Sequence, residues 1–156
     1  MHEFQLIGAF FSGKGARRDD VLLGVGDDAA LLQVPAMEGK EPEIVTAMAT
    51  LRPPPEVGPV YPGPDRLPEK ETPEFLGRRA LGMCLRHLKA SGAVPAWATL
   101  ALTLPEADEA WLRRFSASLG KIARRARVSL VGGDTTRGAL SITVVVNGLR
   151  AGRPDS

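Results

Sequence analysis

Proline is concentrated in one stretch of this chain. Eight of the thirteen prolines lie between Pro53 and Pro73. Each proline lacks a backbone N–H donor and disfavours helical dihedral angles in the residue before it. We therefore expect no helix or strand over residues 52–73, and any fold must be built from the segments on either side. A stretch of this length is either a functional loop or a disordered insertion.

Regular patterns of apolar residues occupy the segments before and after the proline-rich stretch. Apolar residues at helical spacing predict helices, and short apolar runs bounded by glycine or polar residues predict strands. Thr72, Pro73 and Glu74 form a typical helix start, with a capping hydroxyl, a proline in the first turn and an early acid. Helices are expected over residues 3–11, 72–90 and 106–127, and strands over 21–25, 29–34, 43–48, 97–104, 128–131 and 140–147. This order predicts an α+β or α/β fold, with helices on one face of a mainly antiparallel or mixed sheet.

Composition and charge exclude several classes of protein. Hydrophobic residues make up 44% of the chain and charged residues 24%, which is typical of a folded domain. A net charge of +2 over 156 residues does not indicate a nucleic-acid-binding surface. The apolar stretches are shorter than the roughly 20 residues of a membrane span, and the N-terminus has no secretory signal pattern. The single cysteine, Cys84, fits a reducing compartment, so a cytoplasmic protein is expected.

Side chains on the expected helices also need an interpretation. Cys84 is expected to be a small buried apolar residue, because nothing nearby marks a nucleophile and base pair. Helical spacing places His87 on the same stripe as Met83 and Leu88, which predicts an inward, partly buried histidine. The basic residues of the helix over 106–127 lie away from its apolar stripe, and we interpret them as a solvated face rather than a phosphate-binding patch. These basic residues are Arg113, Arg114, Lys121, Arg124 and Arg125.

The first segment with possible chemistry runs from Gly24 to Ala30 and contains two adjacent acids, Asp27 and Asp28. Adjacent carboxylates repel one another, and a hard divalent cation relieves that repulsion. Mg²⁺ prefers carboxylate oxygens and keeps water and substrate phosphates as its other ligands. The residues alone leave two interpretations open, a metal-binding turn and a solvent-exposed Asp-Asp hairpin turn.

The second segment runs from Val131 to Gly138 and reads Val-Gly-Gly-Asp-Thr-Thr-Arg-Gly. Its two glycines, Gly132 and Gly133, permit a close backbone approach to a ligand, and Asp134 is a candidate metal ligand. The two hydroxyls and the guanidinium of Arg137 suit phosphate oxygens. The alternative is a glycine-rich hairpin loop that joins two strands.

Taken together, these segments and two others resemble the thiamine-monophosphate kinase family. The resemblance lies in residues 24–32, 95–105, 108–112 and 131–138, in order along the chain. It implies an AIR-synthetase-like fold whose N-terminal domain pairs its sheet with that of a second subunit in a homodimer. It also implies transfer of the γ-phosphoryl group of ATP to thiamine monophosphate, with Mg²⁺, to give thiamine diphosphate.

The resemblance also implies roles for individual residues. Asp28, with Asp27 beside it, matches a metal-binding turn, and Gly133 and Asp134 match a pair that binds ATP and magnesium. Two other acids of the family have no counterpart here, because Met48 or Ala49, depending on the alignment, stands at the first position and His87 at the second. Thr46 offers only a hydroxyl near the first of these positions.

These observations lead to expectations about domains and activity. Residues 1–150 are expected to form an AIR-synthetase-like N-terminal domain with a divergent loop over 52–73, and residues 151–156 a tail without the family's C-terminal domain. The expected function is the kinase reaction, impaired by the missing acids. The alternative is a catalytically inactive domain that only dimerises or binds nucleotide. A third interpretation, an interaction module built on Pro53–Pro55 in a polyproline II conformation, lacks a flanking recognition pattern.

Overall fold

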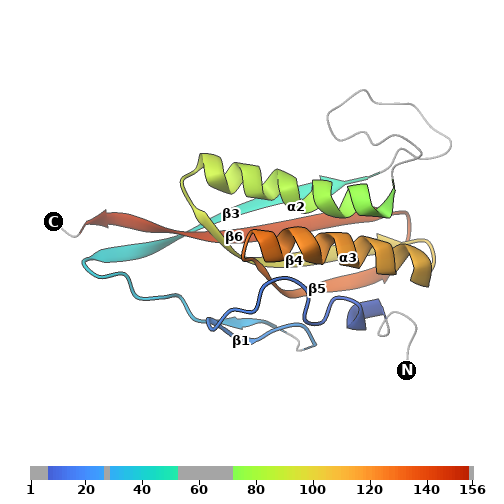
Figure 1. Ribbon diagram of the computed structural model, residues 1–156, viewed down its shortest axis with the longest axis horizontal. Helices are drawn as coiled ribbons and strands as arrows, with labels where there is room; N and C mark the ends of the chain where they lie inside the picture. The colour runs from blue at the N-terminus through green and yellow to red at the C-terminus, as the bar shows by residue number, and fades with distance from the viewer. Residues whose placement is uncertain (1–6, 27–28, 53–71, 155–156) are drawn as a thin grey trace.

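A curved four-stranded sheet with two helices on one face organises this chain (Figure 1). The computed structural model describes residues 7–26, 29–52 and 72–154. Most of the proline-rich stretch, the Asp27-Asp28 pair and residues 3–6 of the helix expected over 3–11 lie outside these residues. Within them, no helix is both long enough and apolar enough to cross a membrane.

The elements largely follow the predicted order. A short antiparallel hairpin pairs the first two strands, with Val21 opposite Leu32. The elements are β1 (Val21–Leu23), β2 (Leu31–Leu32), β3 (Lys40–Leu51), α2 (Pro73–Ala90), β4 (Val94–Leu104), α3 (Glu109–Arg125), β5 (Ser129–Arg137) and β6 (Ser141–Pro154). As predicted, the hydroxyl of Thr72 caps α2 by accepting a hydrogen bond from the backbone N–H of Phe75.

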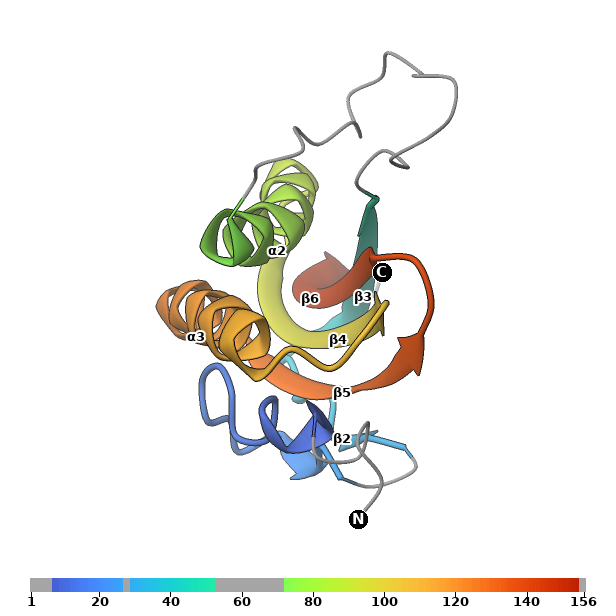
Figure 2. The same ribbon diagram turned by 90° about the vertical axis from the view of Figure 1, so that its right-hand side faces the viewer.

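The strands of the large sheet lie in the order β3-β6-β4-β5. β6 is antiparallel to both β3 and β4, whereas β4 and β5 are parallel and are connected through α3. Figure 2 shows α2 and α3 on the same side of this sheet. The prediction of a mixed sheet with helices on one face is therefore confirmed.

Two strands run further than predicted. β5 continues through the Gly-Gly-Asp-Thr-Thr-Arg segment to Arg137, so the loop expected there is wrong and only a short connection leads to β6. The segment stays extended because its residues pair with β4 from Thr99 to Leu104. β6 passes residue 150, where we placed the domain boundary, and Pro154 lies opposite Lys40 of β3.

The main core lies between the sheet and the two helices. Alternate residues of the central strands point into it, including Leu100, Leu102 and Val144, which are all buried. Cys84 of α2 is fully buried there and its thiol donates a hydrogen bond to the carbonyl of Val144, with Sγ 3.4 Å from the oxygen. Burial raises the pKa of this thiol above its usual value, which confirms Cys84 as a buried structural residue.

Gly77 lets α2 and α3 approach each other closely. A Cβ at this position would lie 2.9 Å from the carbonyl oxygen of Phe115 and 3.2 Å from the backbone nitrogen of Leu119. The hydroxyl of Ser118 donates to the carbonyl of Glu74 over 2.7 Å, which joins the same two helices one turn away. The close approach is therefore specific to glycine and fixes how the helices sit on the sheet.

Candidate nucleotide and metal site

The sheet face opposite the helices carries most of the predicted site residues. Strand alternation places Thr50 of β3 and Thr143 of β6 on this face, with their hydroxyl oxygens 3.0 Å apart. Thr103 of β4 and Thr136 of β5 form a second such pair, at 2.9 Å. These hydroxyls give the face a polar surface over four adjacent strands.

Asp134 lies on this face at the edge strand β5. Its backbone is in register with Ala101, and both side chains are exposed. One carboxylate oxygen accepts a hydrogen bond from the backbone N–H of Thr135 at 3.0 Å, and within the described part of the chain no donor bonds to the other oxygen. Asp134 and Thr136 are two residues apart on a strand, so a carboxylate and a hydroxyl point to the same side. This part of β5 therefore presents hard oxygen ligands to solvent.

The structure gives a reason for a glycine at position 133 that the sequence does not reveal. Its φ is +146°, and a Cβ built there would lie 1.8 Å from the carbonyl oxygen of Leu100 on β4. The register also shifts beside it, because Ala98 pairs with Leu130 whereas Thr99 pairs with Gly132. Gly133 therefore permits a close approach to the neighbouring strand, immediately before Asp134, and the expected approach to a ligand stays a prediction.

Thr46 and Met48 lie on the same face as Asp134 but at the opposite edge of the sheet. Both are exposed, and Met48 has 66% of its surface accessible to solvent. β3 and β5 are separated by β6 and β4, which is three inter-strand spacings of about 4.8 Å, or about 14 Å in all. Ligands of one metal ion lie within about 2–3 Å of it, so Thr46 and Asp134 of one chain do not share an ion.

The inward position predicted for His87 is wrong, because the structure places this side chain in solvent. The buried stripe of α2 includes Gly77, Ala80, Leu81, Cys84 and Leu88. At 100° per residue, His87 lies about 60° around the helix axis from Cys84, at the margin of this stripe. It also lies in the last turn of α2, where its carbonyl accepts bonds from the backbone and the hydroxyl of Ser91.

A polar cluster that sequence reasoning missed anchors the N-terminal segment to the sheet. The guanidinium of Arg18 donates two hydrogen bonds to Asp20, at 3.0 and 2.8 Å, and the indole N–H of Trp97 donates to the same carboxylate at 3.0 Å. Trp97 is 1% exposed, so Asp20 satisfies a buried donor. The Arg18 guanidinium, and after it Trp97, hold the pKa of Asp20 below its ordinary value of 3.8. No periodicity or motif in the sequence pairs these residues.

The predicted metal ligands Asp27 and Asp28 fall outside the described residues. Over residues 7–26, 29–52 and 72–154, no three His, Cys, Asp or Glu side chains gather as a metal-binding group. The described part of the site therefore consists of Asp134 with the hydroxyls of β5.

Nearly the whole chain is similar to thiamine-monophosphate kinases. The family model described as AIR synthase related protein, N-terminal domain, matches residues 26–150. The thiamine-monophosphate kinase of Escherichia coli K12 is 42% identical over 146 residues, which cover 94% of this chain and 41% of that protein. The chain thus spans about two fifths of the length of this curated relative.

Solved structures have the same fold. The crystal structure of thiamine-monophosphate kinase from Stenotrophomonas maltophilia K279a matches with a TM-score of 0.71 at 38% identity, over 94% of this chain and 41% of that one. AaThiL complexed with AMPPCP and TMP matches with a TM-score of 0.56 at 22% identity, over 75% of this chain and 35% of that one, and shows the fold alone. The fold and the resemblance predicted from the motifs are therefore confirmed.

Proposed function

The chain belongs to the AIR synthase related protein family, whose N-terminal domain it matches, and on this basis we propose that it is the nucleotide-binding domain of a thiamine-monophosphate kinase. The proposed reaction is transfer of the γ-phosphoryl group of ATP to thiamine monophosphate, which gives thiamine diphosphate. The observation that carries the proposal is the 42% identity to the Escherichia coli kinase over nearly the whole chain. AaThiL, which shares the fold, was solved with AMPPCP and TMP. We also propose a cytoplasmic location.

The residues of β5 fit a magnesium nucleotide. Mg²⁺ is usually held by one or two carboxylates together with substrate phosphates, and Asp134 presents one exposed carboxylate with a free oxygen. The ion would supply positive charge that offsets the charge developing on the transferred phosphoryl group. Asp134 would orient the nucleotide through the ion, and the hydroxyl of Thr136, on the same side of the strand, would donate a hydrogen bond to a phosphate oxygen. Asp27 and Asp28 are proposed as further ligands from the family motif.

We propose that this chain alone binds magnesium nucleotide but turns over poorly. Two family acids are replaced by Met48 and His87, and the remaining hydroxyl of Thr46 lies about 14 Å from the strand of Asp134. Removal of one electrostatic group from an active site commonly lowers kcat by about 100-fold or more. A domain that binds nucleotide without efficient phosphoryl transfer is the expected result.

We further propose that two copies associate through the open sheet face. Ile44 and Met48 project from this face and are 54% and 66% exposed. Both large apolar side chains lie on the edge strand β3, and among the described residues no strand pairs with its outer edge. A second copy of the chain would remove this apolar surface from water. Sedimentation of Met48→Glu tests the dimer, because a charge at this position should shift the wild-type dimer toward monomer.

The kinase proposal is tested by incubating the chain with ATP, Mg²⁺ and thiamine monophosphate and measuring thiamine diphosphate by chromatography. We expect product at a rate at least about 100-fold below that of the Escherichia coli enzyme measured in parallel. The Asp134→Asn variant should reduce any product further, whereas Asp19→Asn, on an exposed residue outside the site, should not. Product formed at the rate of the full-length enzyme would contradict the proposed impairment. Product that Asp134→Asn leaves unchanged would contradict the role of Asp134.

A further inference from the structure

A groove runs between α2 and α3 on the outer side of the molecule. It has a volume of about 500 Å³ and lies on the helix layer, on the opposite side of the sheet from Asp134. Figure 2 shows the two helices side by side on that outer layer. The groove is lined by Glu74, Arg78, Arg113, Arg114, Ala117, Ser118, Lys121, Ile122 and Arg125.

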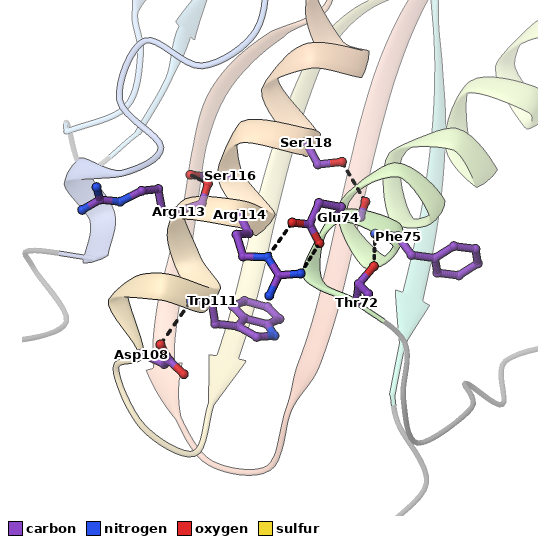
Figure 3. Close-up of polar contacts among 9 residues, drawn as sticks. All are labelled: Thr72, Glu74, Phe75, Asp108, Trp111, Arg113, Arg114, Ser116 and Ser118. Carbon is purple, nitrogen blue, oxygen red and sulfur yellow. Dashed lines mark hydrogen bonds and ion pairs between the residues drawn. The ribbon is translucent and has the colours of Figure 1, made fainter.

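The charge of this groove is strongly positive. Five of the lining residues are basic and Glu74 is the one acid among them. Glu74 is already bound, because Nε and Nη2 of Arg114 donate to its two carboxylate oxygens at 2.5 and 2.9 Å (Figure 3). Arg114 lowers the pKa of Glu74, so this carboxyl remains ionised and paired. Over the described ranges, no carboxylate forms an ion pair with Arg78, Lys121 or Arg125.

The spacing of the basic residues describes the shape of a complementary ligand. Arg114, Lys121 and Arg125 follow one another along α3 at intervals of seven and four residues, which are two turns and one turn. They span eleven residues, or about 16 Å of helix. The lining between them is small or apolar, because Ala117 and Ile122 lie there. Arg114 is already paired with Glu74, so the cations that face a ligand are Lys121 and Arg125, one turn apart on α3, and Arg78 on α2, with the apolar strip beside them.

From this pattern we propose that the α2–α3 groove binds an acidic amphipathic helix of a partner protein. Helices recognise such grooves through side chains one and two turns apart, and Lys121 and Arg125 are one turn apart. Carboxylates at that spacing would meet Lys121, Arg125 and Arg78, and small apolar side chains would contact Ala117 and Ile122. A single phosphate group offers no apolar surface to Ala117 and Ile122, whereas an amphipathic helix does.

The binding of a synthetic peptide of about 15 residues tests this proposal. The peptide is helical and carries glutamates one and two turns apart on one face, with alanine and leucine beside them. Its affinity for the purified chain is measured by fluorescence anisotropy at low ionic strength. An isomeric peptide with the same residues in scrambled order, a single-stranded oligonucleotide and tripolyphosphate serve as competing ligands.

Matched variants distinguish peptide binding in the groove from a general effect of the protein's net charge. The double variant Lys121→Gln/Arg125→Gln removes two cations from the groove, and Arg86→Gln/Arg124→Gln removes two exposed cations from the same helices outside it. We expect the first pair to weaken peptide binding about tenfold and the second less than twofold. Ala117→Tyr fills the groove without a change of charge and should weaken binding at least as much. Circular dichroism confirms that each variant is folded.

Several results would overturn the proposal. Equal losses of peptide affinity in the two double variants would show that binding responds only to net charge. Equal binding of the scrambled peptide would exclude recognition of an amphipathic face. Tighter binding of the oligonucleotide or tripolyphosphate, at equal ligand charge, would assign the groove to a phosphate polyanion instead. Absence of peptide binding at millimolar concentration would exclude the site.

Discussion

Replacement of Gly133 by alanine tests the structural role of this glycine in β5. The new Cβ would lie 1.8 Å from the carbonyl oxygen of Leu100, whereas real Cβ atoms essentially never approach closer than 3.0 Å. β5 would have to move away from β4 by about 1.2 Å, the difference between these two distances. The atoms in the way belong to backbone of the central strand β4, so a side-chain rotation cannot relieve the contact.

The expected loss of stability follows from two costs. Holding a non-glycine residue at a φ of +146° costs about 1–3 kcal/mol. Weakening one or two hydrogen bonds between β4 and β5 adds about 1 kcal/mol each. We therefore expect Gly133→Ala to reduce the free energy of unfolding by about 2–5 kcal/mol, a large part of the 5–15 kcal/mol typical of a domain. At about 2–4 °C per kcal/mol, Tm should fall by about 4–20 °C.

Gly132→Ala provides the matched control. Its Cβ would meet only the Thr99 methyl group at 4.0 Å, so we expect a change of less than about 1 kcal/mol. Urea unfolding followed by circular dichroism measures both variants. If the two variants differ by less than about 0.5 kcal/mol, the structural explanation of Gly133 is refuted. Loss of nucleotide binding with full stability would instead assign this glycine to the ligand.

Three further changes have expected outcomes in stability. Gly77→Ala should destabilise the chain by about 1–3 kcal/mol in urea unfolding, because its Cβ would contact α3. Gly82→Ala, with open space around its Cβ, should stabilise α2 by about 0.5–1 kcal/mol. The pKa of Asp20 is lowered in the folded state, so its ionised carboxylate stabilises the fold above about pH 4, and this stabilisation is lost as the pH falls through the lowered pKa. The fall in Tm below pH 4 should therefore be smaller in Asp20→Asn than in the wild type. Thr72→Ala removes the helix cap and should cost about 1 kcal/mol, which Thr72→Ser should largely restore.

Local signals in the sequence predicted the elements that depend on neighbouring residues. The start of α2 follows from Thr72 and Pro73, whose capping and restricted φ act within one turn. Leu100, Leu102 and Leu104 alternate along β4, and their burial follows from that period. The order of helices and strands was therefore predictable, and so was the class of the sheet.

Features that depend on tertiary contacts were not predictable from the chain. The Gly132-Gly133 pair has the composition of a loop, but pairing with β4 extends it into a strand. His87 has the helical spacing of a core residue, yet it lies at the margin of the buried stripe. Arg125 is exposed, as the solvated-face interpretation predicted, but its place beside a groove depends on the packing of α2 against α3.

The central claim is that β5 carries a magnesium-nucleotide site centred on Asp134. Isothermal titration of the chain with ATP in the presence of Mg²⁺ measures it directly, with titrations in EDTA and of Asp134→Asn in parallel. We predict magnesium-dependent binding that is at least tenfold weaker in Asp134→Asn and unchanged in Asp19→Asn. Binding that is equally strong in EDTA, or that Asp134→Asn leaves intact, would contradict the account.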